Sequence, residues 1–134
     1  MRSMLMLMLG VMAPALLLSA PAAAQANAQA GGKWRVSGNI SGKAFVVDCA
    51  LNERGPRLGG VCVDVTTGES KAKPGKSHAL TAGEVRGRDV RWTYQTKVMF
   101  MSIDIVFTGE LDGTRMNGTV SAKGREGTFS AIRS

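Results

Sequence analysis

The segment Val90–Lys97, VRWTYQTK, decides the fold class of this chain. Its even-numbered positions begin with Val90, Trp92 and Tyr94, and the residues between them are polar. Alternation with a period of two is typical of a β-strand with one buried face. The glycine-containing turn before this segment and the apolar strand predicted after it indicate antiparallel hairpins rather than helices.

The same pattern of strand and turn extends outward to both sides. Glycine, Asp, Asn and Ser clusters recur at the spacing of roughly 8–12 residues that all-β domains show. The predicted strands are Lys33–Ile40, Ala44–Leu51, Val61–Thr66, His78–Arg86, Val90–Lys97, Val98–Glu110, Thr114–Ala122 and Glu126–Arg133, with loops predicted at Asn52–Gly60 and Thr67–Ser77. We therefore predict an all-β, eight-stranded antiparallel up-and-down (meander) barrel over residues 33–134, because closure removes both exposed sheet edges. A two-sheet sandwich is the alternative.

The first thirty residues predict an export signal. A single positive charge precedes the apolar run Met4–Leu18, and the small-residue stretch after that run ends at Ala24. We expect a signal peptide over residues 1–24, with cleavage possible up to residue 30, and a flexible leader over residues 25–32. The expected location is periplasmic or extracellular, with no transmembrane span in the mature chain.

The net charge of +7 favours anionic partners, such as lipopolysaccharide or acidic proteins. The basic residues are scattered rather than clustered, and nucleic acid is not an expected partner of an exported protein. The basic loop that carries Lys71, Lys73 and Lys76 is the candidate contact with an anionic surface.

The two cysteines, Cys49 and Cys62, predict one disulfide in an oxidising compartment. A symmetric hairpin centred on Gly55-Pro56 places them opposite each other on one face. The same register sets Val47 opposite Asp64, which suits burial badly. We therefore expect either a bulge or a face that is only partly buried.

Gly32-Lys33-Trp34 near the start of the domain and Arg133 near its end resemble the pattern of the calycins, which include lipocalins, avidins and fatty-acid-binding proteins. The resemblance implies that Trp34 closes one end of a lipocalin-like barrel while Arg133 packs over the indole. Such a cation–π contact contributes about 0.5–2 kcal/mol. The chain is short for a lipocalin, and it lacks both a second lipocalin motif and the pattern of a biotin site.

The run Gly32–Gly38, GKWRVSG, followed by a cysteine pair is similar to the small periplasmic inhibitors of secreted zinc metalloproteases. Those proteins are eight-stranded barrels with one disulfide, and their N-terminal arm enters the protease cleft. The similarity covers the first third of the domain. It implies that residues 25–32 form a working arm, whereas a flexible leader is the alternative.

The sequence shows no catalytic constellation, so we expect no enzyme, metal or cofactor. His78 is the only histidine, and its place beside the basic loop predicts an exposed residue without a catalytic partner. Asp48 and Asp64 lie on adjacent predicted strands, and solvent-facing strand charges explain them as well as acid–base chemistry does.

The remaining signal is apolar, because a barrel of this size either fills itself or holds one small ligand. The candidate ligand-lining residues are Trp92, Tyr94, Ile103, Ile105, Phe107 and Met116. The first functional hypothesis is a non-enzymatic secreted barrel that binds a small apolar or amphiphilic ligand. The alternatives are a periplasmic protease inhibitor that uses its N-terminal arm and a structural, envelope-associated protein.

Overall fold

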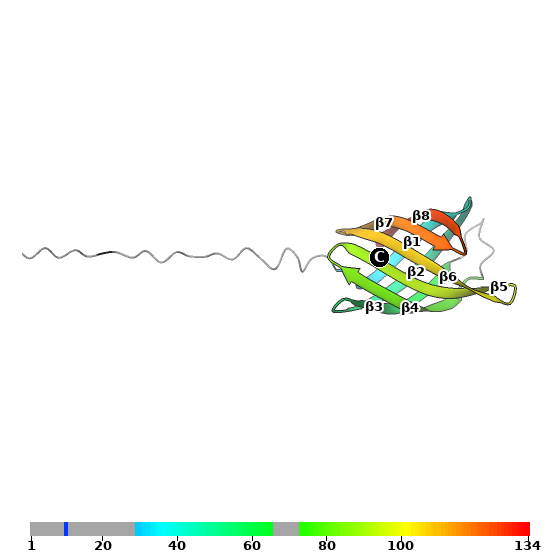
Figure 1. The fold of residues 1–134 in the computed structure, drawn as a ribbon, viewed down its shortest axis with the longest axis horizontal. Coiled ribbons are helices and arrows are strands. Elements are labelled where there is room, and N and C mark those ends of the chain that lie inside the picture. The colour runs from blue at the N-terminus through cyan, green and yellow to red at the C-terminus, as the bar shows by residue number, and fades with distance from the viewer. Residues whose placement is uncertain (1–9, 11–28, 66–72) are drawn as a thin grey trace, which may run out of the picture.

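The chain folds into one closed barrel of eight antiparallel strands in sequential order (Figure 1). The computed structural model describes Gly10, residues 29–65 and residues 73–134. The strands are β1 (Gly32–Ile40), β2 (Lys43–Arg54), β3 (Arg57–Val65), β4 (Ser77–Arg86), β5 (Asp89–Val98), β6 (Met101–Asp112), β7 (Arg115–Ala122) and β8 (Arg125–Arg133). Pairing of β1 with β8 closes the sheet, so the predicted meander barrel is confirmed and the sandwich is wrong. The predicted signal peptide apart from Gly10, residues 25–28 of the leader, and Lys71 lie outside the described residues.

Two strand boundaries differ from the prediction. The expected loop Asn52–Gly60 is largely strand, because β2 and β3 stay paired from Val46↔Val65 to Arg54↔Arg57. Only Gly55-Pro56 remain as the turn, and Gly55 takes the positive φ of 58° that such a tight hairpin turn needs. The glycines and charged residues that suggested a loop therefore lie within paired strands.

The second difference concerns the strand predicted at Val98–Glu110. The chain reverses inside it, at Met99 and Phe100, and β6 begins only at Met101. Both turn residues have positive φ, at 50° and 69°. Positive φ is uncommon for residues other than Gly, Asn and Asp, so the sequence carries no signal for a turn here.

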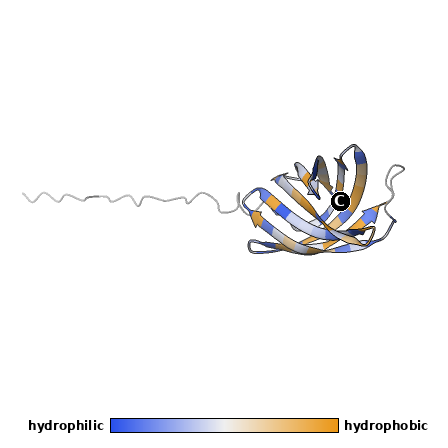
Figure 2. Ribbon diagram, turned by 45° about the vertical axis from the view of Figure 1, so that its right-hand side comes forward, coloured by the Kyte–Doolittle hydropathy of each residue, from blue (hydrophilic) through white to orange (hydrophobic). Residues whose placement is uncertain are grey.

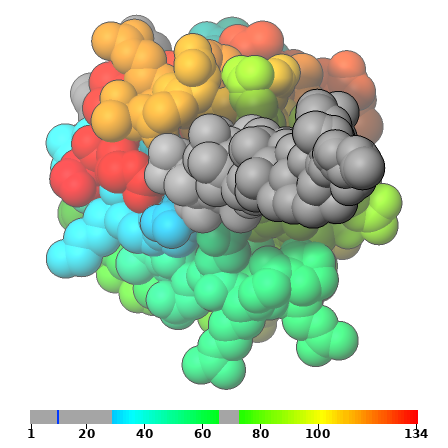
Figure 3. All heavy atoms as spheres, turned by 90° about the vertical axis from the view of Figure 1, so that its left-hand side faces the viewer, coloured from blue at the N-terminus to red at the C-terminus, as the bar shows by residue number. Residues whose placement is uncertain are grey.

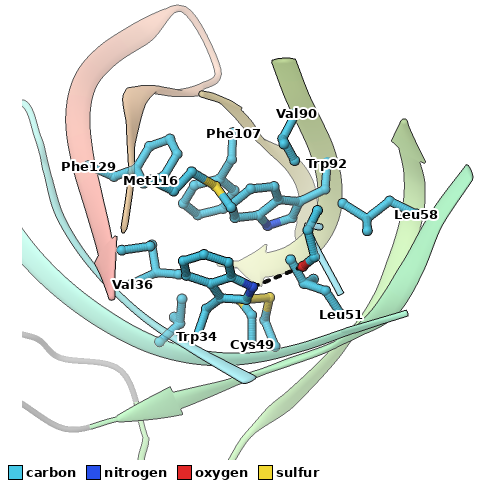
Figure 4. Close-up of a cluster of buried hydrophobic side chains, with 14 of the residues drawn as sticks. Trp34, Val36, Cys49, Leu51, Leu58, Val90, Trp92, Phe107, Met116 and Phe129 are labelled. Atoms are coloured by element: carbon cyan, nitrogen blue, oxygen red, sulfur yellow. Dashed lines mark hydrogen bonds between the residues drawn. A yellow bond between two sulfur atoms is a disulfide. The ribbon is translucent and has the colours of Figure 1, made fainter. Parts of the chain in front are cut away.

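The barrel interior is built by the alternation of apolar and polar residues along each strand, which appears as bands of contrasting hydropathy in Figure 2. An aromatic stack occupies the centre, where the Trp92 and Phe107 rings lie 4.8 Å apart and nearly parallel. Phe129 meets both rings edge-on, and Met116 lies beside them (Figure 4). These side chains fill the middle of the barrel.

The predicted disulfide between Cys49 and Cys62 is confirmed, and it joins directly opposed positions of β2 and β3. The ladder around it is regular, so no bulge relieves the juxtaposition of Val47 and Asp64. Both of these residues point inward, and Val47 is buried. The inward carboxylate of Asp64 is instead accommodated by a polar partner, described below.

The barrel has two ends, the floor and the rim. The floor end carries the turns at residues 55–56, 87–88 and 113–114 together with residues 29–31 and the C-terminus. The rim end carries the connections at residues 41–42, 99–100 and 123–124 together with residues 73–76. Every strand, strand pair and the disulfide lie within residues 29–134, so this part of the chain contains the complete barrel and its core.

Candidate functional site

The floor end is sealed by Trp34 and Arg133. These residues are paired across β1 and β8, and the Arg133 guanidinium carbon lies 4.2 Å from the centroid of the Trp34 ring. The indole is fully buried, and its Nε1–H donates a 2.9 Å hydrogen bond to the carbonyl oxygen of Ala30 (Figure 4). The geometry is the one that the calycin resemblance led us to expect.

Arg133 also fixes the segment that precedes β1. Its Nη1 donates to the carbonyl of Gly31 and its Nη2 to that of Gln29, each at 2.6 Å. Gly32 has a φ of 121°, and a Cβ there would lie 2.8 Å from Arg133 Nη1, so the glycine of the G-x-W motif makes room for the guanidinium. Figure 3 looks onto this end, where the C-terminal residues lie beside the start of β1.

The last residues of the predicted flexible leader are held against the barrel, which the sequence did not predict. Residues 29–32 lie against the floor, and Ala30 is fully buried. The reason is the set of hydrogen bonds from Trp34 and Arg133 to successive carbonyls, which alternation patterns do not reveal. Residues 25–28, the remainder of that leader, are outside the described part.

A row of laterally paired positions connects the floor to the rim. Arg133 pairs with Trp34, Trp34 with Cys49, Cys49 with Cys62, and Cys62 with His78. Because the strands of a barrel are tilted, such a row climbs along the axis as it crosses the sheet. The guanidinium seal, the disulfide and the only histidine thus belong to one continuous band.

His78 and Asp64 form an inward polar pair near the rim, and the expectation of an exposed loop histidine was wrong. His78 is 5% exposed, and its Nε2 lies 2.9 Å from Asp64 Oδ2. Its Nδ1 lies 3.1 Å from the carbonyl of Gln95, and its ring stacks on Tyr94 at 4.9 Å. The expectation of a solvent-facing Asp64 was also wrong, since its side chain is 13% exposed.

The structure fixes the orientation of the His78 ring. Both of its nitrogens lie within hydrogen-bond distance of an oxygen atom, one of the Asp64 carboxylate and one of the Gln95 carbonyl. Burial, together with the negative charge of Asp64, raises the pKa of the Tyr94 hydroxyl above its ordinary value, so that hydroxyl stays protonated near neutral pH.

Asp48 cannot act together with Asp64, because the two side chains lie on opposite faces of the sheet. Asp48 faces outward and accepts two hydrogen bonds from Arg35, at 2.8 and 2.9 Å. Hydrogen bonding to Arg35 lowers the pKa of the Asp48 carboxyl. The alternative reading of Asp48 as a solvent-facing strand charge therefore agrees with its position.

The structure places only part of the six residues predicted to line a ligand site in one cluster. Trp92, Phe107 and Met116 are fully buried and Tyr94 is 4% exposed, all within the central core. Ile103 and Ile105 follow on β6 toward the rim and are only partly buried. Four of the predicted residues thus form the filled middle of the barrel, and two lie nearer its rim.

Other apolar residues continue the core toward the rim. Ile40, Phe45 and Leu80 pack against the core together with Ile105, and all four keep part of their surface in solvent. Deeper in the barrel, Trp92 Nε1 is buried and has no hydrogen-bond partner in the described structure. A buried donor without an acceptor is unusual enough to need an explanation, such as a bound water or ligand.

Sequence reasoning missed two features of the rim. The Asp64–His78 pair could have been found, because the predicted cysteine register already placed Asp64 on the inward face. The exposed tip of the β5–β6 hairpin could not, because its residues read as continuous strand. Lys73 and Lys76 are exposed at the rim as expected, and the Lys76 carbonyl accepts a 2.9 Å hydrogen bond from Asp64 N–H.

Among the described residues, no group of three or more His, Cys, Asp or Glu side chains is placed to hold a metal ion. Over the same part of the chain, no helix has the length and apolar character needed to cross a bilayer. Neither a family model, a curated protein nor a solved structure matches the chain. A closed barrel is shared by proteins of many functions, so the fold alone assigns neither a family nor an activity.

Proposed function

We propose that this chain is a non-enzymatic barrel that binds a small apolar or amphiphilic ligand at its rim end. The observation that carries the proposal is the difference between the two ends. At the floor, the Trp34 indole and the Arg133 guanidinium stack on each other and donate hydrogen bonds to three backbone carbonyls. At the rim, Ile40, Phe45, Leu80 and Ile105 leave apolar surface in solvent directly above the aromatic core.

One polar feature inside the barrel supports an amphiphilic rather than a purely apolar ligand. The buried Trp92 Nε1–H lacks an acceptor, and a buried donor left unpaired costs about 1–3 kcal/mol. An acceptor atom of a ligand, or a water bound with it, would recover that energy. Both ring nitrogens of His78 contact oxygen atoms of the protein itself, which supports the non-enzymatic part of the proposal.

Isothermal titration of residues 25–134 with monomeric dodecanoate and with monomeric lysophosphatidylglycerol tests the proposal. The variant Ile40→Thr/Ile105→Thr keeps β-branched side chains but removes apolar rim surface. We expect its affinity to fall at least tenfold, because each side chain loses about 1 kcal/mol of apolar contact. Ile132→Thr is the matched control, since Ile132 is an exposed isoleucine near the floor.

Amide chemical shifts give the location of the ligand independently of affinity. Rim residues of β2, β4 and β6 should shift on titration, while residues of the turns at 55–56 and 113–114 should not. Absence of binding for both amphiphiles, or equal losses in the rim variant and the Ile132→Thr control, would contradict the proposal.

A second candidate, protease inhibition through an N-terminal arm, is favoured by the anchorage of residues 29–31. An arm that enters a protease cleft binds more tightly when its root is fixed, because less conformational entropy is lost. Arg133 and Trp34 supply such a fixed root by holding the carbonyls of Gln29, Ala30 and Gly31.

The inhibitor hypothesis is tested by removing residues 25–28 and leaving the anchored residues in place. The deletion should abolish inhibition of a secreted zinc metalloprotease without changing the free energy of unfolding. In a separate variant, Arg133→Lys keeps the charge but loses the two-pronged contact, so inhibition should weaken. Undiminished inhibition by the deletion variant would rule out a working arm.

A further inference from the structure

The β5–β6 hairpin ends in a run of exposed apolar residues, Val98, Met99, Phe100 and Met101, called the hairpin tip below. Their exposed fractions are 48%, 87%, 104% and 49%. The other large apolar residue exposed on the described surface is Ile132, near the floor. Isolated exposed apolar residues are ordinary in soluble proteins, but a contiguous group indicates an interaction site.

The hairpin tip stands clear of the neighbouring strands. Pairing of β5 with β6 continues to Val98↔Met101, whereas β4 pairs with β5 only as far as Tyr94 and β7 pairs with β6 only from Ile105. The last four residue pairs of the hairpin therefore extend roughly 13 Å past the last positions at which β5 pairs with β4 and β6 pairs with β7. Figure 1 shows this hairpin reaching past the rest of the barrel at the rim.

The turn residues are unfavourable for the conformation they adopt. Met99 and Phe100 both have positive φ, which the mirror-image hairpin turn requires and which Asn-Gly adopts with least strain. Strained backbone of this kind concentrates at functional sites. Folding alone therefore does not account for a methionine and a phenylalanine at the two most exposed positions of the hairpin.

Lysines flank the hairpin tip, and the acidic residue Asp104 lies on the same hairpin and accepts a hydrogen bond from Gln95. Lys97 precedes it on β5, and Lys123 in the β7–β8 turn brings its Nζ to 3.7 Å from Met101 Sδ. Lys43, Lys73 and Lys76 are exposed at the other rim connections. At the floor, by contrast, arginines alternate with acids, as in the contact between Arg88 and Glu110. Lysines beside a protruding apolar residue are complementary to phosphate groups above an acyl layer.

We infer that the hairpin tip inserts into an anionic phospholipid bilayer while the rim lysines contact the lipid phosphates. A bilayer suits the shape of the tip, because a narrow convex turn lacks the broad surface of about 800 Å² per partner that a stable protein interface needs. The net charge of +7 also disfavours a second copy of the chain as the occupant. The tip and the lysines differ from the apolar rim residues of the proposed ligand site, so either role can hold without the other.

Flotation of residues 25–134 with vesicles tests the inference. Vesicles of phosphatidylcholine alone are compared with vesicles that also contain phosphatidylglycerol. The variant Met99→Asn/Phe100→Gly removes the apolar tip and supplies the residues that the turn prefers, so it should fold at least as stably as the parent. We expect its partition coefficient on anionic vesicles to fall at least tenfold, while Ile132→Ser stays within twofold of the parent.

A second pair of variants tests the charge. Lys97→Gln/Lys123→Gln should lower partitioning at least tenfold and flatten its dependence on salt, because each lysine near an anionic membrane contributes severalfold to binding. Arg86→Gln/Arg115→Gln removes the same charge from the floor end and should change partitioning less than twofold.

Several outcomes would overturn the inference. They are absence of parent binding to anionic vesicles, equal binding to phosphatidylcholine alone, and undiminished binding of the Asn-Gly variant. Sedimentation that shows a dimer lost in the Asn-Gly variant would assign the tip to a second copy instead. Monomeric dodecanoate titrated into the same variant separates the two proposals, because the ligand site predicts unchanged affinity there.

Discussion

The floor and the rim of this barrel are made by the same eight strands and yet end in opposite ways. At the floor, Trp34 and Arg133 donate hydrogen bonds to the carbonyls of residues 29–31. At the rim, the β5–β6 hairpin outruns its neighbours and apolar residues stay partly exposed. The proposed ligand and membrane contacts therefore lie at the end opposite to the Trp34–Arg133 contact, and mutations at the two ends should differ in their effects.

The largest effect is expected from Trp34→Ala at the floor. Removal of the buried indole leaves a cavity, strands the Ala30 carbonyl and deprives Arg133 of its stacking partner, so unfolding should become easier by about 3–5 kcal/mol. Ile105→Ala near the rim should cost less than about 2 kcal/mol, because that side chain is only partly buried. Urea denaturation of both variants makes the comparison, and equal losses would contradict the division between the ends.

Loss of the disulfide should rank next. Cys49 and Cys62 are separated by 13 residues, so the Cys49→Ala/Cys62→Ala variant should lose about 3 kcal/mol of stability. The register of β2 and β3 does not depend on the disulfide. The variant should therefore still partition onto anionic vesicles under conditions where it remains folded. Denaturation with and without a reductant, followed by flotation, would show whether the bond supports the fold only.

Tyr94 should make the fold less stable at alkaline pH. Its pKa is raised in the folded state, so its contribution is complete below the unfolded value of 10.0 and is lost as the pH rises through the raised pKa. One pH unit above 10.0, the parent should have lost about 1.4 kcal/mol that Tyr94→Phe does not lose. Tyr94 is the only tyrosine, so absorbance titration reports it alone. An ordinary pKa in that titration would show that the hydroxyl is not enclosed as described.

The smallest effect is expected on the outer surface, between the two ends. Arg35 lowers the pKa of Asp48, so the pair contributes above pH 3.8 and its contribution is lost as the pH falls through the lowered pKa. Arg35→Gln should therefore weaken stability slightly at neutral pH and flatten its decline in acid. Arg91→Gln, an outward-facing change on β5, serves as control in low-salt denaturation. A loss comparable with that of the disulfide would contradict a solvent-screened pair.

Much of the architecture could be predicted because it depends on period-two alternation and on turn residues with a preferred φ. The Cys49–Cys62 disulfide could be predicted from two cysteines and one Gly-Pro turn, whereas the sequence left the register around it open and the structure shows a regular ladder there. The contact of Arg133 with Trp34 accords with the calycin resemblance. The loop predicted at Asn52–Gly60 was wrong, because glycines and charged residues also occur within paired strands, as they do here in β2 and β3. Local composition cannot distinguish a long loop from two paired strands that are joined by a two-residue turn.

The rim was harder to predict because its features depend on contacts between strands that are distant in sequence. His78 is buried only because Asp64 from β3 and the Gln95 carbonyl from β5 supply partners for both nitrogens. The turn at Met99 and Phe100 contradicts local preference and exists because the strands on either side pair with each other. The alternation pattern of one strand reveals neither the contacts that its side chains make with other strands nor the strand with which it pairs.

The hydrogen bonds at the floor bear on how the chain would be matured by an export peptidase. A cut after Ala24 leaves Gln29 and Ala30 in the product, so the Trp34 and Arg133 donors keep their acceptors. A cut after Ala30 removes two of those acceptors and creates a cationic amino group on Gly31, whose carbonyl is held by the guanidinium of Arg133. That amino group and the guanidinium carry like charges, so of the two cleavage sites that the sequence predicts, the contacts at the floor favour the earlier one.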